Sequence, residues 1–365
     1  MRMLHSVLRP VVVPASLLLA WMPACVLEAE GASPAGGGGG SIATGGQGGT
    51  GATSQGGSGG SGSVQNPGED AGAPVDPDAG FPPGPDANSP PDTGADSDPG
   101  TGTQPGAMYV GFRSSSYGLN PRPSPQYFSD TAKHMAAQFP GSKPAGLWIV
   151  GVIGSTECMF EFPSDGSTLE NATFAGEDAA EPYFDHFDQE GISIWIQIEP
   201  GDVDVVRAIQ VTLDRYHHHP SVVGFGVDNE WLERSSYEWG RPVTDDDARL
   251  WLATVRAYNP NYTLFLKHWV SDMMPPTERD GLIFINDSQG FWDPGLETLA
   301  SEFQKWGAAF PTGTVAFQYG YPADQHWWAA LSDPFVDIGQ RLTSIPNNTG
   351  LFWVDFSLYD LYPPY

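Results

Sequence analysis

Two acidic residues stand close together at the end of an apolar run, in the stretch VVGFGVDNEW that covers residues 222–231. Asp228 and Glu230 are two positions apart, so in an extended strand both side chains point to the same face while Asn229 points to the other. Two carboxylates held side by side repel each other as anions, and the pKa of one is expected to rise. Such a carboxyl group can act as a general acid near neutral pH.

Cleavage of a glycosidic bond requires an acid that protonates the leaving oxygen and a second group that stabilises or captures the positive sugar centre. We assign the acid role to Glu230, further out along the strand, and the role of holding and tuning it to Asp228. The alternative is that both acids only cap the next helix or pair with Arg234 or Arg241. Aromatic residues near strand ends, such as Trp231, favour the first interpretation because sugar rings stack on flat side chains.

Eight short apolar runs recur over residues 107–365, and most of them end in polar residues. Their Val, Ile, Phe and Trp residues follow one another without alternation, which is typical of strands covered on both faces in a parallel sheet. Helical patterns separate most of the runs, and together they predict a (β/α)8 TIM barrel of about 260 residues. The predicted strands are 108–115, 146–154, 192–201, 222–231, 262–269, 281–289, 313–321 and 350–357. The predicted helices are 124–139, 177–191, 202–219, 244–259, 293–310 and 324–342.

The active site of such a barrel lies at the C-terminal ends of its strands, so the residues that close the runs are expected to meet in one cleft. Glu199 closes the third run and is the leading candidate for a partner carboxylate to Glu230, followed by Asp287 and Asp355. Lys267 could contact substrate hydroxyls or pair with a neighbouring acid. The residues expected to contact substrate are Arg113, Trp231, Lys267, Asp287, Gln318, Tyr319 and Trp353.

The stretch GFGVDNE resembles the fourth-strand signature of the chitinase family, the family-18 glycoside hydrolases, whose pattern is Gly, any, Asp, any, Asp, any, Glu. Gly224, Asp228 and Glu230 match this pattern, and Gly226 stands where the first Asp of the family belongs. The resemblance implies that Glu230 is the acid and that Asp228 orients an acetamido group of the substrate, whose oxygen is the nucleophile. By the same resemblance, Tyr319 and Trp353 correspond to aromatic residues that line chitinase sites.

Two other groups of barrel enzymes share parts of the pattern. Asn229 and Glu230 at the end of the fourth run resemble the retaining β-glycanases, but those enzymes need a Glu nucleophile after the seventh run, where this chain has Gln318 in AFQYGY. The combination of Asp-x-Glu with the later FQY resembles the family-25 lysozymes, which cut peptidoglycan. The resemblances cover a handful of residues and indicate a broad class of barrel glycosidases.

The N-terminal part of the chain indicates export and a spacer. Residues 1–25 have a basic start, an apolar run too short to span a membrane, and Cys25 after a small residue, which predicts a lipoprotein signal with Cys25 as the lipid-bearing residue. The alternative is ordinary secretion. Residues 26–106 are rich in Gly and Ser and then in Pro and Asp, which predicts a disordered linker. We expect an extracytoplasmic protein, held at the membrane only through its lipid anchor or secreted.

The charge of the chain excludes one class of partner. The whole sequence has a net charge of −28, and residues 107–365 keep 34 acidic against 14 basic side chains. Nucleic-acid binding needs a basic face, so we expect none. No cofactor is expected, and we expect a monomer. We also predicted no metal site, because the histidines 217–219 cannot converge on one ion while they are helical. Cys158 is expected to be a structural thiol.

The sequence therefore predicts a tethered or secreted barrel glycoside hydrolase that acts on a polysaccharide, with an N-acetylated polymer such as chitin or peptidoglycan as the first expectation. The alternative is a non-catalytic carbohydrate-binding surface lipoprotein on the same scaffold, suggested by the missing first Asp of the chitinase pattern and the missing seventh-strand Glu. A third interpretation is a barrel enzyme of unrelated chemistry, such as a lyase or esterase, but residues 107–365 contain no Gly-x-Ser-x-Gly elbow that would support an esterase.

Overall fold

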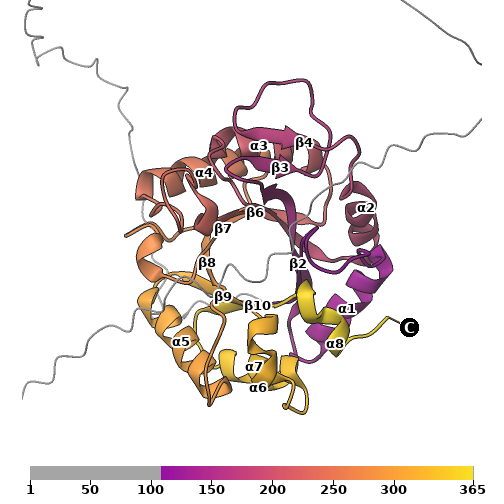
Figure 1. The fold of residues 1–365 in the computed structure, drawn as a ribbon, viewed down its shortest axis with the longest axis vertical. Helices are drawn as coiled ribbons and strands as arrows, with labels where there is room; N and C mark the ends of the chain where they lie inside the picture. The colour runs from indigo at the N-terminus through magenta and orange to yellow at the C-terminus, as the bar shows by residue number, and fades with distance from the viewer. Residues whose placement is uncertain (1–107, 365) are drawn as a thin grey trace, which may run out of the picture. The chain divides into compact units, whose positions relative to one another are not determined.

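The computed structural model describes residues 108–364, so the predicted signal segment, Cys25 and the predicted linker lie outside the described residues. Eight parallel strands form a closed barrel, because the sheet runs from β1 through β10 to β2 and β1 also pairs with β2 (Figure 1). The predicted TIM barrel is therefore confirmed. The barrel strands are β1 Tyr109–Ser114, β2 Lys143–Ile153, β5 Ser193–Ile198, β6 Val222–Asp228, β7 Thr263–Lys267, β8 Leu282–Asn286, β9 Thr314–Tyr319 and β10 Asn348–Val354.

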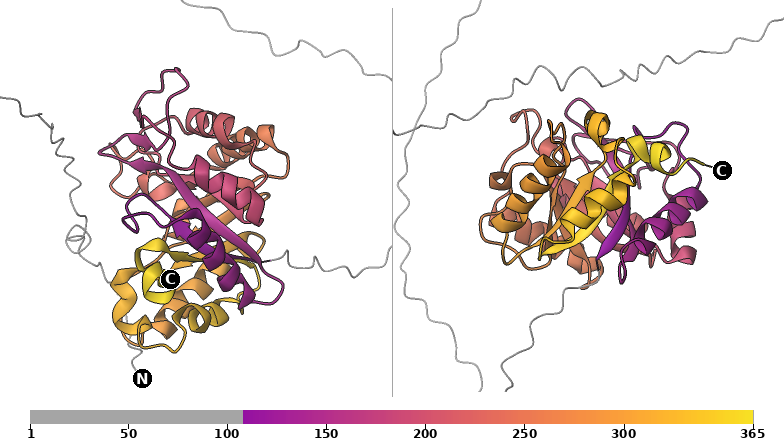
Figure 2. Two further views of the ribbon diagram at one scale, coloured as in Figure 1. Left: turned by 90° about the vertical axis from the view of Figure 1, so that its right-hand side faces the viewer. Right: turned by 90° about the horizontal axis from the view of Figure 1, so that it is seen from below.

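Helices surround the barrel, as the views in Figures 1 and 2 show. Helix α4 begins with a capping box, in which the Thr244 side chain accepts from the Asp247 amide and the Asp247 side chain accepts in return. The predicted helix over 324–342 is wrong in one respect, because it is split into α6 and α7, with Asp333 capping the second. The helices are α1 Pro125–Ala137, α2 Glu181–Glu190, α3 Val205–Tyr216, α4 Asp245–Tyr258, α5 Leu296–Ala309, α6 Gln325–Trp328, α7 Pro334–Leu342 and α8 Leu358–Leu361.

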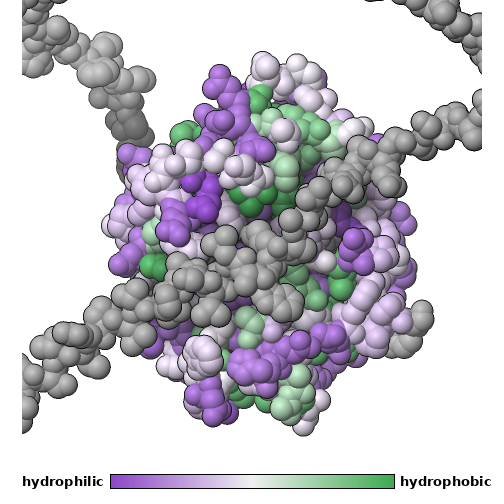
Figure 3. Space-filling view, in the orientation of Figure 1, coloured by the Kyte–Doolittle hydropathy of each residue, from purple (hydrophilic) through white to green (hydrophobic). Residues whose placement is uncertain are grey.

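Two short strands that the sequence did not predict lie in the long connection after β2. Strand β3 (Cys158–Phe160) pairs antiparallel with β2, and β4 (Ala172–Phe174) pairs parallel with β3. They extend the sheet beyond the closed barrel. In the space-filling view, the largest apolar area on the visible face lies over these two strands, where Met159 is 39% exposed (Figure 3). Cys158, the first residue of β3, is fully buried, and burial raises the pKa of its thiol, as fits a structural residue.

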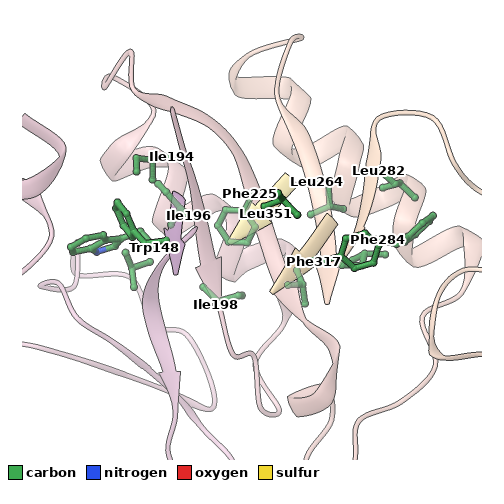
Figure 4. Close-up of a cluster of buried hydrophobic side chains, with 14 of the residues drawn as sticks. Trp148, Ile194, Ile196, Ile198, Phe225, Leu264, Leu282, Phe284, Phe317 and Leu351 are labelled. Atoms are coloured by element: carbon green, nitrogen blue, oxygen red, sulfur yellow. The ribbon is translucent and has the colours of Figure 1, made fainter. Parts of the chain in front are cut away.

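Apolar side chains fill both sides of the barrel wall. Strand residues that point outward pack against the helices in one large cluster, part of which Figure 4 shows around Trp148, Phe225 and Phe317. Alternate residues point inward and close the lower part of the barrel. The inward cluster is Ala145, Leu147, Trp195, Phe265, Ile285, Ala316 and Phe352. Within residues 108–364, no helix has the length and apolar character needed to cross a membrane.

Candidate active site

Polar side chains replace the apolar ones at the next inward level of the barrel. Trp195, Phe265 and Ala316 belong to the inward apolar cluster, so the residues two positions later on their strands point inward as well. Each of these later residues is polar and buried. The side chains placed in this way are Gln197 after Trp195, Lys267 after Phe265, and Gln318 after Ala316, and Glu199 follows Gln197 at the same spacing just beyond β5. The strand ends therefore bring most of the predicted site residues to one end of the barrel.

Glu230 lies just beyond its strand. Strand β6 ends at Asp228, and Asn229–Trp231 form a 3-10 turn, so the expected strand alternation does not place Glu230. The Glu230 side chain is partly exposed and has no hydrogen bond or ion pair with any residue in 108–364. Burial raises the pKa of Glu230 well above its ordinary value, and the negative charges of Asp228 and Asp287 raise it further. This carboxyl group is free to hold a proton and to meet a ligand.

A lysine joins the two carboxylates beside Glu230. The Nζ atom of Lys267 lies 2.7 Å from Asp228 Oδ2 and 2.7 Å from Asp287 Oδ2, and all three side chains are buried. Burial alone would lower the pKa of Lys267, but the two carboxylates outweigh it and hold that pKa well above its ordinary value. Of the two predicted roles of Lys267, the structure shows the ion pair.

Asp228 keeps one oxygen free. Its Oδ2 atom also accepts a hydrogen bond of 3.2 Å from Gln197 Nε2, while its buried Oδ1 atom has no partner among the described residues. Burial raises the pKa of Asp228 to about 7 against the opposing effect of Lys267, and the charges of Asp287 and Glu199 add to the rise. Oδ1 of Asp287 and Oε1 of Gln318 are also buried without a described partner. Unpaired buried polar atoms at one end of a barrel indicate a place for a polar ligand.

Glu199 is held from two sides. Its Oε2 atom accepts from the Ile153 amide at 2.9 Å, and its Oε1 atom accepts from the hydroxyl of Tyr117. Burial raises the pKa of Glu199, although both hydrogen bonds oppose the rise. Tyr117, whose side chain is 44% exposed, was not predicted as a site residue. The structure also adds Tyr321, a buried residue whose hydroxyl accepts from Gln318 Nε2.

Arg113 and Asp355 are bound to each other, 3.0 Å apart and buried. Arg113 also donates to Ser115 Oγ at 2.7 Å, and its guanidinium lies 4.7 Å from the ring centre of Phe356. Oδ2 of Asp355 accepts from the Ser115 amide at 2.8 Å. These contacts tie the first barrel strand to the segment after the last one. Neither Arg113 nor Asp355 is as free for a ligand as the sequence led us to expect.

Tyr319 and Trp353 are corrected by the structure. Both are buried in the outward cluster between barrel and helices, where Tyr319 stacks on Phe335 at 5.9 Å and Trp353 donates to Ser357 Oγ at 2.8 Å. Gln318 points inward, so Tyr319, its neighbour on β9, points outward. Their position fits core packing, and the proposed substrate contact of both residues was wrong.

Other aromatic residues occupy the connections after β6, β7 and β8. Trp231 shares the 3-10 turn with Glu230, is half-buried, and has the guanidinium of Arg234 5.7 Å from its ring centre. The rings of Trp239 and Trp269 meet edge to face at 5.6 Å. Trp292 is 80% exposed. These connections follow the strand ends that carry Asp228, Lys267 and Asp287, as sugar-stacking residues would have to do.

The alternative roles of the acidic pair find no support in the described contacts. Arg234 donates to the carbonyl oxygens of Tyr237 and Glu238, and Arg241 pairs with Glu233 and Asp247. The side chain of Asp228 makes no capping bond to the 3-10 turn that follows it. Neither arginine is a partner of Asp228 or Glu230, so that interpretation was wrong.

No protein-family model matches the chain, and no curated protein matches its sequence. Several solved structures are similar to this chain at low identity. An FMN-binding β-glucuronidase from Facaelibacterium prausnitzii L2-6 superposes with a TM-score of 0.41 at 11% identity, over 69% of this chain and 38% of that one. The tamarind chitinase-like lectin gives 0.40 at 12%, over 70% and 96%. The glycoside hydrolase domain of PgaB (BpsB) from Bordetella bronchiseptica gives 0.41 at 9%, over 69% and 96%.

The chain spans less than half the length of the glucuronidase. At these identities and TM-scores the similarity carries no argument about function, and the chemistry has to be argued from the side chains.

The departure from the chitinase pattern at Gly226 has a packing reason. A Cβ atom at this position would lie 1.9 Å from Cζ of Phe265, whose ring fills the barrel directly below Asp228 and Lys267. An Asp side chain at position 226 therefore has no room. The ring of Phe265 occupies the space in which the chitinase pattern would place a third acidic side chain.

Proposed function

We propose that this chain is a glycoside hydrolase in which Glu230 is the general acid. The observation that carries the proposal is the state of the Glu230 carboxyl group. It lies at the end of a barrel strand, without a described hydrogen-bond partner, and burial and two neighbouring carboxylates raise its pKa. A carboxyl group with a raised pKa keeps its proton to higher pH than an ordinary carboxyl group and can deliver it to the leaving oxygen of a glycosidic bond.

The proposed substrate is a polysaccharide with N-acetylated sugars, such as chitin or peptidoglycan. Lys267 and Gln197 fix Oδ2 of Asp228 and leave Oδ1 free. In the proposed reaction, Asp228 Oδ1 accepts a hydrogen bond from the acetamido N–H of the substrate. The acetamido oxygen then attacks the anomeric carbon as Glu230 protonates the departing oxygen, and water later opens the resulting ring. This part of the proposal rests on the Asp-x-Glu resemblance together with the free oxygen.

A protein carboxylate would have to act if the substrate carries no acetamido group. Glu199 is the first candidate, because it is buried at the end of the neighbouring strand and is oriented by Tyr117 and the Ile153 amide. Asp287 is the second, since Lys267 holds one of its oxygens and the other is unpaired.

The test is product release by the full chain from chitin, peptidoglycan, xylan, β-glucan, mannan and galactosaminogalactan. Glu230→Gln keeps the shape of the side chain and removes the acid, so we expect it to lose most turnover while the fold is retained. Glu238→Gln, in the exposed connection that follows, is the matched control and should remain active. Full activity of Glu230→Gln would refute the assignment of the acid.

The second candidate function is non-catalytic carbohydrate binding. The observation that favours it is the engagement of both Asp228 and Asp287 by Lys267, which leaves these carboxylates partly neutralised. Glycan binding by the full chain, without any product between pH 4 and pH 8, would decide for this alternative and against the hydrolase.

We further propose that the protein is exported and acts outside the cytoplasm as a monomer, held by a lipid on Cys25 or secreted. The basic and apolar start of the chain and the Gly- and Pro-rich residues 26–106 support this proposal. A spacer of this length would let the barrel reach an insoluble polymer away from the membrane.

A further inference from the structure

Histidines and acids meet on the outside of the barrel, between α2 and the segment that follows α3. Helix α3 ends at Tyr216, so His218 and His219 are not helical, and the premise on which metal binding was discounted was wrong. Nε2 of His218 and Nε2 of His219 each lie 3.6 Å from Oε1 of Glu181. Glu181 is the first residue of α2. One potential ligand atom from each of these three residues lies within 4.8 Å of the other two.

The hydrogen bond between His219 and Asp188 leaves the Nε2 atom of His219 free to bind a ligand. Nδ1 of His219 lies 2.7 Å from Oδ2 of Asp188, and the other oxygen of Asp188 accepts from the Ser221 amide at 2.9 Å. Because a carboxylate can only accept, Nδ1 must carry the hydrogen, which in neutral imidazole leaves a lone pair on Nε2. That Nε2 atom is buried and has no hydrogen-bond partner among the described residues, in a side chain that is 2% exposed.

The free Nε2 atom of His219 lies 3.6 Å from the Glu181 carboxylate, and Nε2 of His218 lies at the same distance from that carboxylate. A buried nitrogen without a partner needs a donor or a cation. A metal ion bound by Glu181, His218 and His219 would satisfy this nitrogen and the carboxylate together.

The distances fit a metal ion. Zinc binds histidine nitrogen and carboxylate oxygen at about 2.0 to 2.2 Å, so two ligand atoms of a tetrahedral site lie about 3.4 Å apart. The two nitrogen to oxygen separations of 3.6 Å are close to this value before any adjustment. Asp188 accepts from Nδ1 of His219, the nitrogen that would not bind the metal. A metal-binding histidine usually has a second carboxylate in this position, which orients its ring.

We propose that Glu181, His218 and His219 form a binding site for one divalent transition-metal ion, with Zn²⁺ as the preferred ion and Asp188 as the residue that positions His219. The site is separate from the barrel mouth, and the partial exposure of Glu181 and His218 opens it to solvent. A water molecule completes the tetrahedron. The ion would clamp the start of α2 to the chain between α3 and β6, and so stabilise this side of the barrel wall.

The experiment is a titration of the full chain, without a histidine tag and freed of metal, with Zn²⁺ alone at pH 7.5 in the calorimeter. We expect one equivalent to bind, and saturation to raise the unfolding temperature by about 5 °C. His218→Ala removes an exposed ligand that packs little, and it should weaken binding at least 10-fold. Asp188→Asn keeps the three ligands and should weaken binding about 10-fold to 100-fold.

His217→Ala is the matched control, because His217 is the adjacent histidine and its Nδ1 atom contacts only the Leu213 carbonyl oxygen. Its Zn²⁺ affinity should equal that of the unchanged protein. The proposal is overturned if Zn²⁺ does not bind in a saturable way. It is also overturned if His218→Ala and His217→Ala bind equally well. Circular dichroism of each variant separates a loss of ligand from a loss of fold.

Discussion

Replacement of Lys267 by Met tests the electrostatic arrangement of the candidate site. The substitution keeps an unbranched side chain of similar length and removes the charge that lies 2.7 Å from both Asp228 and Asp287. Breaking a buried ion pair by removing one partner costs about 3 to 5 kcal/mol in the free energy of unfolding, because the other charge stays buried without compensation. We expect a loss of this size at pH 8.5.

The loss should depend on pH in a defined direction. Burial raises the folded-state pKa of Asp228 from 3.8 to about 7, so the folded protein holds a proton that the unfolded chain releases, and its stability falls as the pH rises toward 7. Without Lys267 this pKa rises further. Between about pH 7 and pH 8.5 the variant then keeps a proton that the unchanged protein has released. One proton over about 1.5 pH units corresponds to about 2 kcal/mol.

The assay is urea unfolding of the full chain, followed by tryptophan fluorescence and extrapolated to water, at pH 6.0 and pH 8.5. The loss caused by Lys267→Met should be about 2 kcal/mol larger at pH 8.5. Lys305→Met is the control, because Lys305 is 73% exposed and its pair with Glu302 contributes little. A loss that is equal at the two pH values, or smaller at pH 8.5, would refute the reasoning.

Three further predictions concern activity, packing and export. Asp228→Asn should shift the alkaline limb of the kcat/KM profile to lower pH by about one unit, because the Asp228 charge raises the pKa of Glu230; an unmoved limb would contradict this coupling. Gly226→Ala should destabilise the barrel by about 1 to 3 kcal/mol in urea unfolding through overpacking, whereas Gly176→Ala, with nothing within 4 Å, should stay within about 0.5 kcal/mol. Cys25→Ser should abolish incorporation of labelled fatty acid and release the protein from membranes, and retention there would count against the lipid anchor.

The barrel could be predicted because each of its strands is buried on both faces and therefore forms a continuous apolar run. All eight runs correspond to barrel strands. The short strands β3 and β4 were missed because three residues each are too few for a periodic pattern. The break between α6 and α7 could have been predicted, because Asp333 followed by Pro334 is typical of the start of a helix.

The site was predictable where a strand fixed the direction of a side chain. Lys267 and Gln318 follow inward apolar residues at a spacing of two, and Glu199 continues the alternation two residues after Gln197. The same rule would have excluded Tyr319. Tyr117 could not have been found, because it lies in a connection whose path depends on tertiary contacts.

The ion pairs of the site were equally out of reach. Two residues of opposite charge at neighbouring strand ends are compatible with contact, but only the closed barrel brings Lys267 between Asp228 and Asp287. The third helix was also predicted three residues too long, because the prediction extended it to His219. A helical path would point the histidines in different directions, so their proximity to Glu181 was missed.

The ring of Phe265 also restricts how this barrel can change. A larger residue at position 226 avoids overlap with the Phe265 ring only after position 265 has become smaller. An Asp at position 226 thus requires two substitutions in a fixed order, and the intermediate with a small residue at 265 carries a cavity beneath the carboxylates. The two positions should vary together among descendants of this chain, and a glycine at one should accompany an aromatic residue at the other.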